Sequence, residues 1–321
     1  MGKLDTESKK YVSNPKIFAD AFNYLIYEGE QIINPSSLHA VDTTEIAVPY
    51  RNNAKAPVQK YRDTMKIWAA MQDENAVYVL LGGELQSSIH YAMPPRNMLY
   101  DSINYASQVD AARASYKKSY KNIKLDKDGI RIQLTDEEFL SGFRKGDKLI
   151  PIITAVIYFG ADEWDAPMSI HEMLNVPDPR LLRLIPDYRI NLIAPAMIPE
   201  EDFDSKFHTG FGTLLHVIKH KNDSVSDIFE SIMMKAKHLD VPSFELIEDI
   251  ANVKFEYEID EKGEVNVCKA MEAYKLKNKV VGAIEAFRDM NISEEEIAER
   301  VAKKFNVTVE YVKELMMPKA V

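Results

Sequence analysis

The first regular pattern in the chain is helical. Residues 15–27 begin with Pro15, which suits a first helical turn, and their apolar side chains recur at helical spacing. These side chains are Ile17, Phe18, Ala21, Phe22, Leu25 and Ile26. The pattern predicts a helix over 15–27 with one face in the core.

Three extended segments follow this helix. Residues 39–50 and 61–68 are typical of strands, and a turn at 73–75 separates the second from the third. The third, 76–83, is an apolar run of strand length that leads directly into Glu84-Leu85-Gln86. The sequence therefore predicts a buried strand that ends in polar side chains.

A second helix and a fourth strand complete the first half of the chain. After Pro95 the apolar residues recur at helical spacing to about Tyr116, and 117–147 is polar and loop-like. Residues 149–160 are so rich in β-branched side chains that they predict a fully buried central strand. The order helix, three strands, helix, strand indicates an α/β fold, a mixed sheet flanked by helices.

From residue 166 the pattern is mainly helical, so we expect a core over 1–165 and a helical region over 166–321. Short helices are predicted over 169–175, 179–185, 211–219, 225–238 and 243–251, and 254–260 alternates weakly. The chain ends in an element over 279–316 that resembles a helix-turn-helix (HTH), with helices predicted over 279–290, 293–304 and 308–316. Glu294, Glu295 and Glu296 begin its middle helix and would repel phosphates. This favours a bundle cap or dimerisation element over a DNA reader.

Charge is distributed unevenly along the chain. The sequence has 40 Lys and Arg against 50 Asp and Glu, a net charge of −10, yet residues 1–150 hold 20 basic and 19 acidic residues. The excess acid lies in the second half, which leaves the first half open to nucleic acid. A basic run with Tyr116 and Tyr120 between its members suits a surface that follows phosphates, although a solvated loop is the alternative. Its members are Arg113, Lys117, Lys118, Lys121, Lys124 and Lys127.

Several function classes are disfavoured by the sequence. Cys268 is the single cysteine, so no intrachain disulfide is expected and the protein is predicted to be cytoplasmic. No stretch approaches the roughly 18 apolar residues of a membrane span, so we expect no membrane partner. Gly210-Phe211-Gly212 is too short to indicate a nucleotide cofactor, and His216 and His220 lack the glutamate of a zinc protease helix.

Two carboxylates have a spacing that suits a divalent cation. Asp63 lies in one predicted strand and Glu84 at the end of the next, and neighbouring strands are about 4.8 Å apart. Gln86 shares a face with Glu84 because the two are separated by one residue. Oxygen ligands at a sheet edge suit Mg²⁺ or Mn²⁺, and the third polar side chain could orient an attacking water. The alternative is a solvated strand end with a structural pair.

Several segments, taken in order, resemble one known family. They are Arg62-Asp63, then YVLLGGELQSSIHYAMPPRNMLYDSINYASQV, then LIPIITAVIYFGADEWDAPMSIHEML. FADAFNYLIYEG and VDTTEIAVPY are similar to the same group. This group is the PD-(D/E)XK nuclease family transposases, also called recombination-promoting nucleases or YhgA-like transposases. The resemblance is close over residues 11–175 and looser beyond them.

The resemblance implies a restriction-endonuclease-like αβββαβ core and a metal-dependent DNA endonuclease linked to recombination or mobile elements. It places the catalytic motif on Asp63 and on Glu84-Leu85-Gln86, with Asp20, or alternatively Glu28, as the acidic residue of the first helix. Gln86 departs from the lysine of the wider superfamily. That departure leaves room for an alternative, a DNA-binding or interaction protein with little or no turnover. A homodimer is expected from the resemblance alone.

Two further features are open to two interpretations each. Arg96, in the first turn after Pro95, suits a phosphate at a helix N-terminus, or else an exposed salt bridge. Gly82 and Gly83 precede Glu84 and allow either a bulge with a close approach by nucleic acid or a crowded helix packed on the strand.

Overall fold

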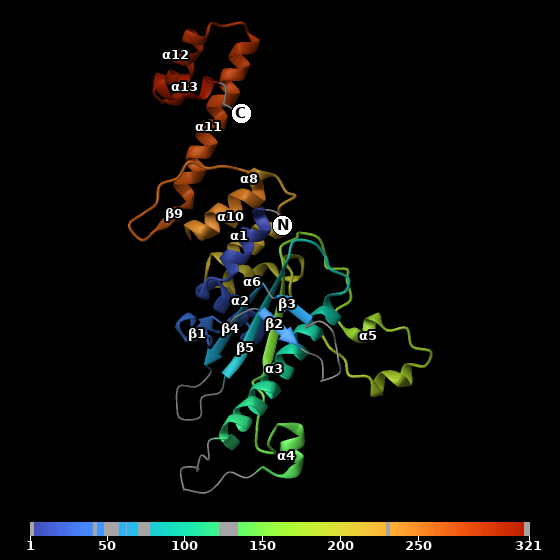
Figure 1. Ribbon diagram of the computed structural model, residues 1–321. Coiled ribbons are helices and arrows are strands. Elements are labelled where there is room, and N and C mark those ends of the chain that lie inside the picture. The colour runs from blue at the N-terminus through green and yellow to red at the C-terminus, as the bar shows by residue number, and fades with distance from the viewer. Residues whose placement is uncertain are drawn as a thin grey trace. The chain divides into compact units, whose positions relative to one another are not determined.

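The computed structural model describes residues 3–40, 44–47, 58–61, 63–69, 78–121, 134–228 and 232–317 (Figure 1). These residues form two compact units, Met1–Lys219 and His220–Val321. The division falls later in the chain than the boundary predicted at residue 165. The physical reason is that residues 166–219 contribute a strand to the sheet of the first unit and a helix that packs against its N-terminal helices.

The first unit is built on a mixed five-stranded sheet in the order β1-β4-β5-β6-β7. Its strands are β1 (Leu38–Ala40), β4 (Thr64–Ala69), β5 (Tyr78–Gln86), β6 (Ile152–Tyr158) and β7 (Asn191–Ile193). The pairs β1–β4 and β4–β5 are antiparallel, whereas β5–β6 and β6–β7 are parallel. A separate two-stranded hairpin, β2 (Thr44–Ala47) with β3 (Val58–Tyr61), lies between β1 and β4 in the sequence.

Two helices of this unit, α2 and α3, lie before and after strands β1 to β5 in the sequence. α2 (Pro15–Tyr27) coincides with the predicted first helix, and α3 (Met93–Lys121) extends the predicted second helix at both ends. The others are α1 (Lys3–Val12), α4 (Asp136–Ser141), α5 (Ile170–Met173), α6 (Glu200–Ser205) and α7 (Gly210–Lys219), with 3₁₀ turns at Pro35–Ser37, Pro179–Leu184 and Pro195–Met197.

Local capping explains where α2 begins and ends. The side chain of Asn14 accepts a hydrogen bond from the backbone N–H of Lys16, and Pro15 occupies the first turn. The helix ends at Glu28, whose φ of 52° is left-handed. Between these ends Phe18 and Phe22 are fully buried and anchor the helix in the core.

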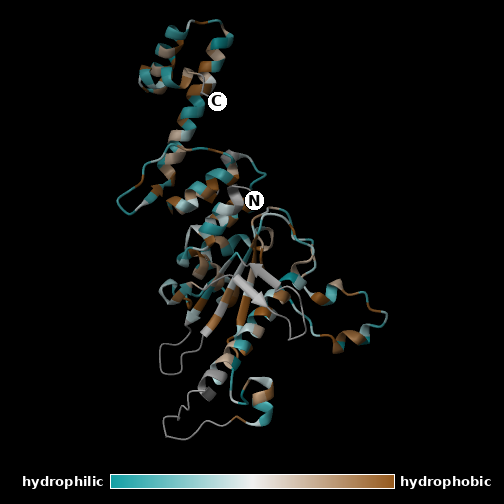
Figure 2. Cartoon of the chain, in the orientation of Figure 1, coloured by the Kyte–Doolittle hydropathy of each residue, from teal (hydrophilic) through white to brown (hydrophobic). Residues whose placement is uncertain are grey.

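The two faces of β5 have different cover. Side chains alternate along a strand, so Gly83 shares its face with Thr64 of β4, where Phe18 of α2 packs. Glu84 lies on the other face with Val156 of β6. There Val156 belongs to a core cluster with Met93 of α3, and the central strands in Figure 2 are correspondingly hydrophobic. The sheet thus lies between α2 on one side and α3 on the other.

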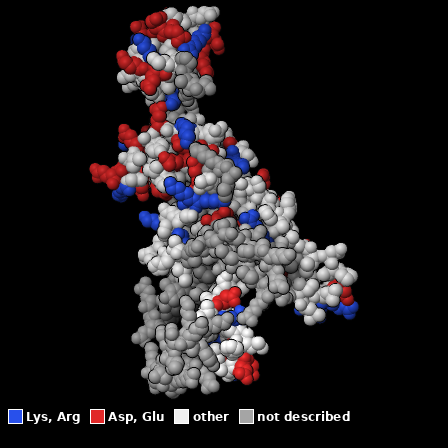
Figure 3. Space-filling view, viewed as in Figure 1, with Lys and Arg blue, Asp and Glu red and all other residues white. Residues whose placement is uncertain are grey.

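The second unit is mainly helical and ends in three helices. α11 (Val267–Asp289), α12 (Glu294–Phe305) and α13 (Val309–Met316) enclose a core that includes Val280, Ile297 and Val301. Before them come α8 (Val225–Ile228), α9 (Met234–Ala236), α10 (Val241–Ala251) and the antiparallel pair β8 (His238–Asp240) and β9 (Glu264–Asn266). Glu294, Glu295 and Glu296 are exposed at the start of α12, and acidic side chains crowd the surface of these last helices in Figure 3.

Several sequence predictions need correction. The predicted loop over 117–147 instead contains the last turn of α3 and the capped helix α4, whose Thr135 and Glu138 form a reciprocal capping box. The predicted helix over 225–238 ends earlier: within its described part 225–228 and 234–236 are helical, and β8 begins at His238. The charged helix α1 was not predicted, because its sequence lacks a long apolar face. No helix among the described residues is long and apolar enough to cross a bilayer.

Candidate functional site

Asp63 lies immediately before β4 and reaches across to β5. Its Oδ2 accepts a hydrogen bond from the backbone N–H of Leu85 at 2.8 Å. Its Oδ1 is 3.0 Å from the Nζ of Lys9 on α1, and both side chains are largely buried. The carboxylate is therefore fixed beside the end of β5 by one backbone donor and one side-chain cation.

Glu84 lies on the face of β5 that α3 covers, and its side chain has no exposed surface. Its Oε2 is 3.2 Å from the guanidinium of Arg96, in the first turns of α3. A fully buried carboxylate is costly unless a cation compensates its charge, and Arg96 provides that charge here. One interpretation of Arg96 was an exposed salt bridge. Arg96 does form a salt bridge, but its partner Glu84 is buried.

Arg96 experiences the charges of both carboxylates. Partial burial by itself would lower the pKa of Arg96, but attraction to Glu84, the hydrogen bond to Tyr100 and a weaker attraction to Asp63 raise it above its usual value. Its Nε donates to the hydroxyl of Tyr100 at 3.1 Å. Asp63 and Glu84 thus lie at the end of β5, each with a cation beside it: Lys9 for Asp63 and Arg96 for Glu84.

Gln86 is the last residue of β5 and is half-buried. It lies on the same face of the strand as Glu84, and its backbone carbonyl accepts from the N–H of Phe159 at 2.8 Å. The next two residues, Ser87 and Ser88, are exposed. The amide side chain of Gln86 consequently lies where the buried strand reaches the surface.

Asp20 occupies a different setting. Its carboxylate accepts hydrogen bonds from the backbone N–H groups of His208 and Thr209 and from the hydroxyl of Thr209, at 2.6–3.1 Å. Burial raises its pKa, and the hydrogen bonds from Thr209 and His208 offset part of that rise. These contacts tie α2 to the segment that leads into α7. Glu28, the alternative for this position, is the exposed last cap of α2.

The predicted basic run is only partly described. Arg113 is half-buried and donates to Asp110 and to the carbonyl of Ser141, so it fastens α3 to the end of α4. Tyr116 donates to Asp147, and the guanidinium of Arg144 lies 4.3 Å from its ring centroid. The side chains of Lys117, Lys118 and Lys121, and all of Lys124 and Lys127, lie outside the described residues.

Gly83 is crowded mainly by the neighbouring strand. A Cβ added there would lie 2.8 Å from Cγ2 of Thr64 on β4, and in ordinary contact, at 3.8 Å, with the ring of Phe18 on α2. The glycine therefore leaves room for the side chain of Thr64, and α2 packs on the same face of β5.

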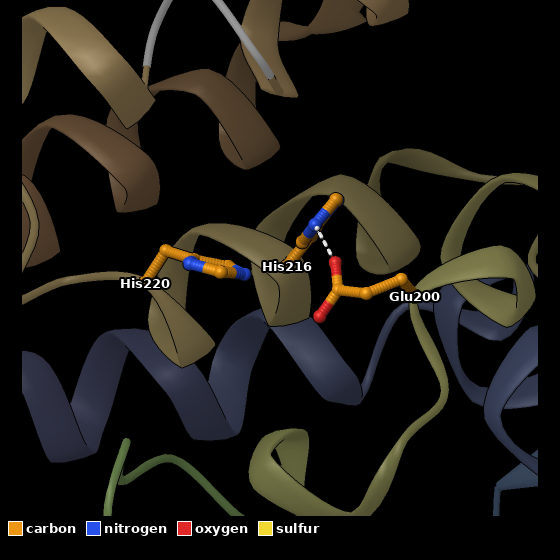
Figure 4. Close-up of side chains that lie close together, drawn as sticks. All are labelled: Glu200, His216 and His220. Carbon is orange, nitrogen blue, oxygen red and sulfur yellow. Dashed lines mark hydrogen bonds and ion pairs between the residues drawn. The ribbon is translucent and has the colours of Figure 1, made fainter.

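Two other groups of His and carboxylate side chains in the described residues could hold a metal ion. In one, shown in Figure 4, Nε2 of His216 is 2.8 Å from Oε2 of Glu200, and His220 follows one helical turn after His216. The other comprises His238, Asp260 and Glu264. The spacing of His216 and His220 was visible in the sequence, but the approach of Glu200 from α6 was not.

Comparison with known proteins gives one positive result. Residues 135–242 match the family model described as "Putative transposase, YhgA-like". This segment contains β6 and β7 and excludes Asp63 and Glu84. No curated protein and no solved structure matches the chain. Over residues 135–242 the chain is thus similar to the YhgA-like transposase family, the family that its sequence also resembles.

Proposed function

We propose that this protein is a metal-dependent DNA endonuclease with a restriction-endonuclease-like core. The observation that carries the proposal is that Asp63 is hydrogen-bonded to the end of β5 and that Glu84 of the same strand is fully buried against Arg96. The chain order of α2, β1, β4, β5, α3 and β6 supports it, because this is the order αβββαβ with the β2–β3 hairpin inserted. The family match supports a role in recombination or mobile-element biology.

The donor set fits a hard divalent cation. Asp63 and Glu84 offer carboxylate oxygens, and the amide oxygen of Gln86 lies on the same strand face as Glu84. Mg²⁺ or Mn²⁺ held by Asp63 and Glu84 would supply an acidic water and charge stabilisation for the phosphorane-like transition state. Glu84 already has a cation beside it in Arg96, so a metal ion bound by Glu84 would share the carboxylate with Arg96 or displace it.

The residues of the chain have separate tasks in this proposal. Gln86 orients the attacking water through its amide group, which donates and accepts hydrogen bonds but carries no charge. Arg96, once a second cation neutralises Glu84, is free to bind the phosphate next to the cleaved bond. Lys117, Lys118 and Lys121 continue along α3 and, with Arg113, are proposed to contact the DNA backbone further from the cut. A second copy of the chain would provide a site for the opposite strand.

A second candidate is a DNA-binding protein on the same scaffold without turnover. The observation in its favour is that Gln86 is neutral and that Asp63 and Glu84 each already have a basic partner. This candidate predicts salt-dependent DNA binding that persists when both carboxylates are replaced.

The test is nicking of supercoiled plasmid in Mg²⁺ by the full chain and by Asp63→Asn and Glu84→Gln. We expect each variant to lose roughly 10³-fold in rate, since several kcal/mol of transition-state stabilisation depends on the site. Glu30→Gln, at an exposed position after α2, is the matched control and should cleave at the wild-type rate. Equal nicking by all four proteins would contradict the nuclease, and DNA binding without any nicking would favour the second candidate.

A further inference from the structure

We infer that Lys9 supplies the positive charge that Gln86 does not bring to the proposed active site, and that it contacts the phosphate being cleaved. The inference rests on the proposed nuclease function. The observation behind it is that Nζ of Lys9 is 3.0 Å from Oδ1 of Asp63, although the two residues lie on different elements. No sequence motif connects them.

The position of Lys9 is set by a docked helix. α1 packs against α2 and β5, and its Ser8, Tyr11 and Val12 are buried. Lys9 lies among these buried residues, and its side chain is 20% exposed. It is therefore mostly buried but still accessible to solvent. Such a lysine keeps its ammonium beside Asp63 while leaving room for a substrate oxygen. Exposed ion pairs rarely have this constraint.

The other basic groups near the sheet are less suited to this task. Lys66 of β4 is on the face that packs on α2, with Nζ 5.4 Å from the ring centroid of Phe18, and burial lowers its pKa. Arg96 is held by Glu84 and Tyr100. Lys9 is the compact, three-donor cation next to Asp63, and an ammonium of this kind is a strong donor to a phosphate oxygen.

The step assisted by Lys9 is phosphodiester hydrolysis. The oxygen of a water molecule forms a bond to phosphorus, the bond from phosphorus to the 3′ oxygen breaks, and a proton from the water ends on that 3′ oxygen. The products are a 5′-phosphate and a 3′-hydroxyl. Lys9 keeps its proton and donates a hydrogen bond to a non-bridging oxygen, where negative charge grows in the transition state.

The prediction is a loss of turnover that a second lysine can restore. Lys9→Gln should lower kcat for plasmid nicking by about 100-fold while KM stays within about twofold, because the charge acts mainly in the transition state. Gln86→Lys in the Lys9→Gln background should restore at least about tenfold of the loss, since it places an ammonium on the face of β5 that carries Glu84. Lys10→Gln, on the exposed side of α1, is the matched control and should have wild-type kinetics.

Melting temperatures of all variants, together with DNA affinity in Ca²⁺, separate this role from a structural one. If Lys9→Gln cleaves like Lys10→Gln, or if its loss follows a lower melting temperature and Gln86→Lys restores nothing, the assignment of Lys9 is wrong and the nuclease stands. If the wild-type protein does not nick DNA in Mg²⁺ or Mn²⁺, the nuclease and the role of Lys9 are overturned together.

Discussion

Two regions of the first unit hold buried carboxylates in opposite ways. Asp20 is 1% exposed, and every hydrogen bond it accepts comes from the neutral groups of His208 and Thr209. Glu84 is also fully buried, yet its partner is the guanidinium of Arg96, and neighbouring Asp63 contacts the ammonium of Lys9. Burial alone therefore does not separate a structural carboxylate from a functional one.

The nature of the partners does separate them. Backbone N–H groups before α7 cannot leave Asp20 unless the segment that carries them moves. Lys9 and Arg96 end long side chains that can turn toward another anion without movement of the backbone. A carboxylate with exchangeable cationic partners suits ligand binding, whereas one held by backbone donors suits a permanent joint between elements.

The largest expected effect on stability is at Asp20. Asp20→Ala removes the buried acceptor of three partly buried donors and should lower the free energy of unfolding of the first unit by about 1–3 kcal/mol, as measured by urea denaturation. Asp20→Asn keeps one acceptor oxygen and should cost less. Nicking per folded molecule should remain near wild type in both. A large loss of nicking with unchanged stability would instead make Asp20 a member of the active site.

A smaller effect is expected between the two regions, at Gly83. Gly83→Ala places a methyl group 2.8 Å from Cγ2 of Thr64, so the side chain of Thr64 or the pairing of β4 with β5 must shift, at a cost of about 1–3 kcal/mol. Thr64→Ser removes that methyl group and should recover most of the loss in the double variant. Thermal melts of the single and double variants measure this. A Gly83→Ala protein as stable as wild type would show that this face is looser than the packing implies.

The sequence predicted the sheet better than it predicted the site. The helix over 15–27 was recovered at both ends because Pro15 and an apolar face mark it, and β6 was recovered because its residues are β-branched and buried on both faces. Asp63 lies beside the end of β5, because its carboxylate accepts a hydrogen bond from the N–H of Leu85, the residue after Glu84. Each of these depends on local pattern or on neighbouring strands.

The missing parts depend on contacts distant in sequence. Lys9 meets Asp63, Asp20 meets Thr209, and Glu200 meets His216, and no periodicity encodes such pairs. The carboxylate of Asp20 gave no sign of its capping role, because its partners are backbone groups 188 and 189 residues away. The basic run was visible in composition, but whether Arg113 faced solvent or α4 depended on the fold.

The smallest effect is expected at Glu200, a carboxylate with charged partners at an exposed position. Partial burial alone would raise the pKa of Glu200. Hydrogen bonds from Lys219 and His216 have the larger, opposite effect and lower this pKa to about 2. A carboxylate with a folded-state pKa below its ordinary 4.5 binds fewer protons when folded, so it contributes stability above pH 4.5 that is lost as the pH falls toward about 2.

Glu200→Gln should therefore lower the melting temperature at pH 7 and differ less from wild type near pH 3. The side chain of Glu200 is 54% exposed, so solvent screening keeps the effect near or below about 1 kcal/mol, and high salt should reduce it further. Glu201→Gln, the exposed neighbour, is the control. Melting temperatures of wild type and Glu200→Gln that differed equally at pH 7 and pH 3 would contradict this prediction. The contrast between Glu84, paired with a cation, and Asp20, held by neutral donors, would then rest on geometry alone.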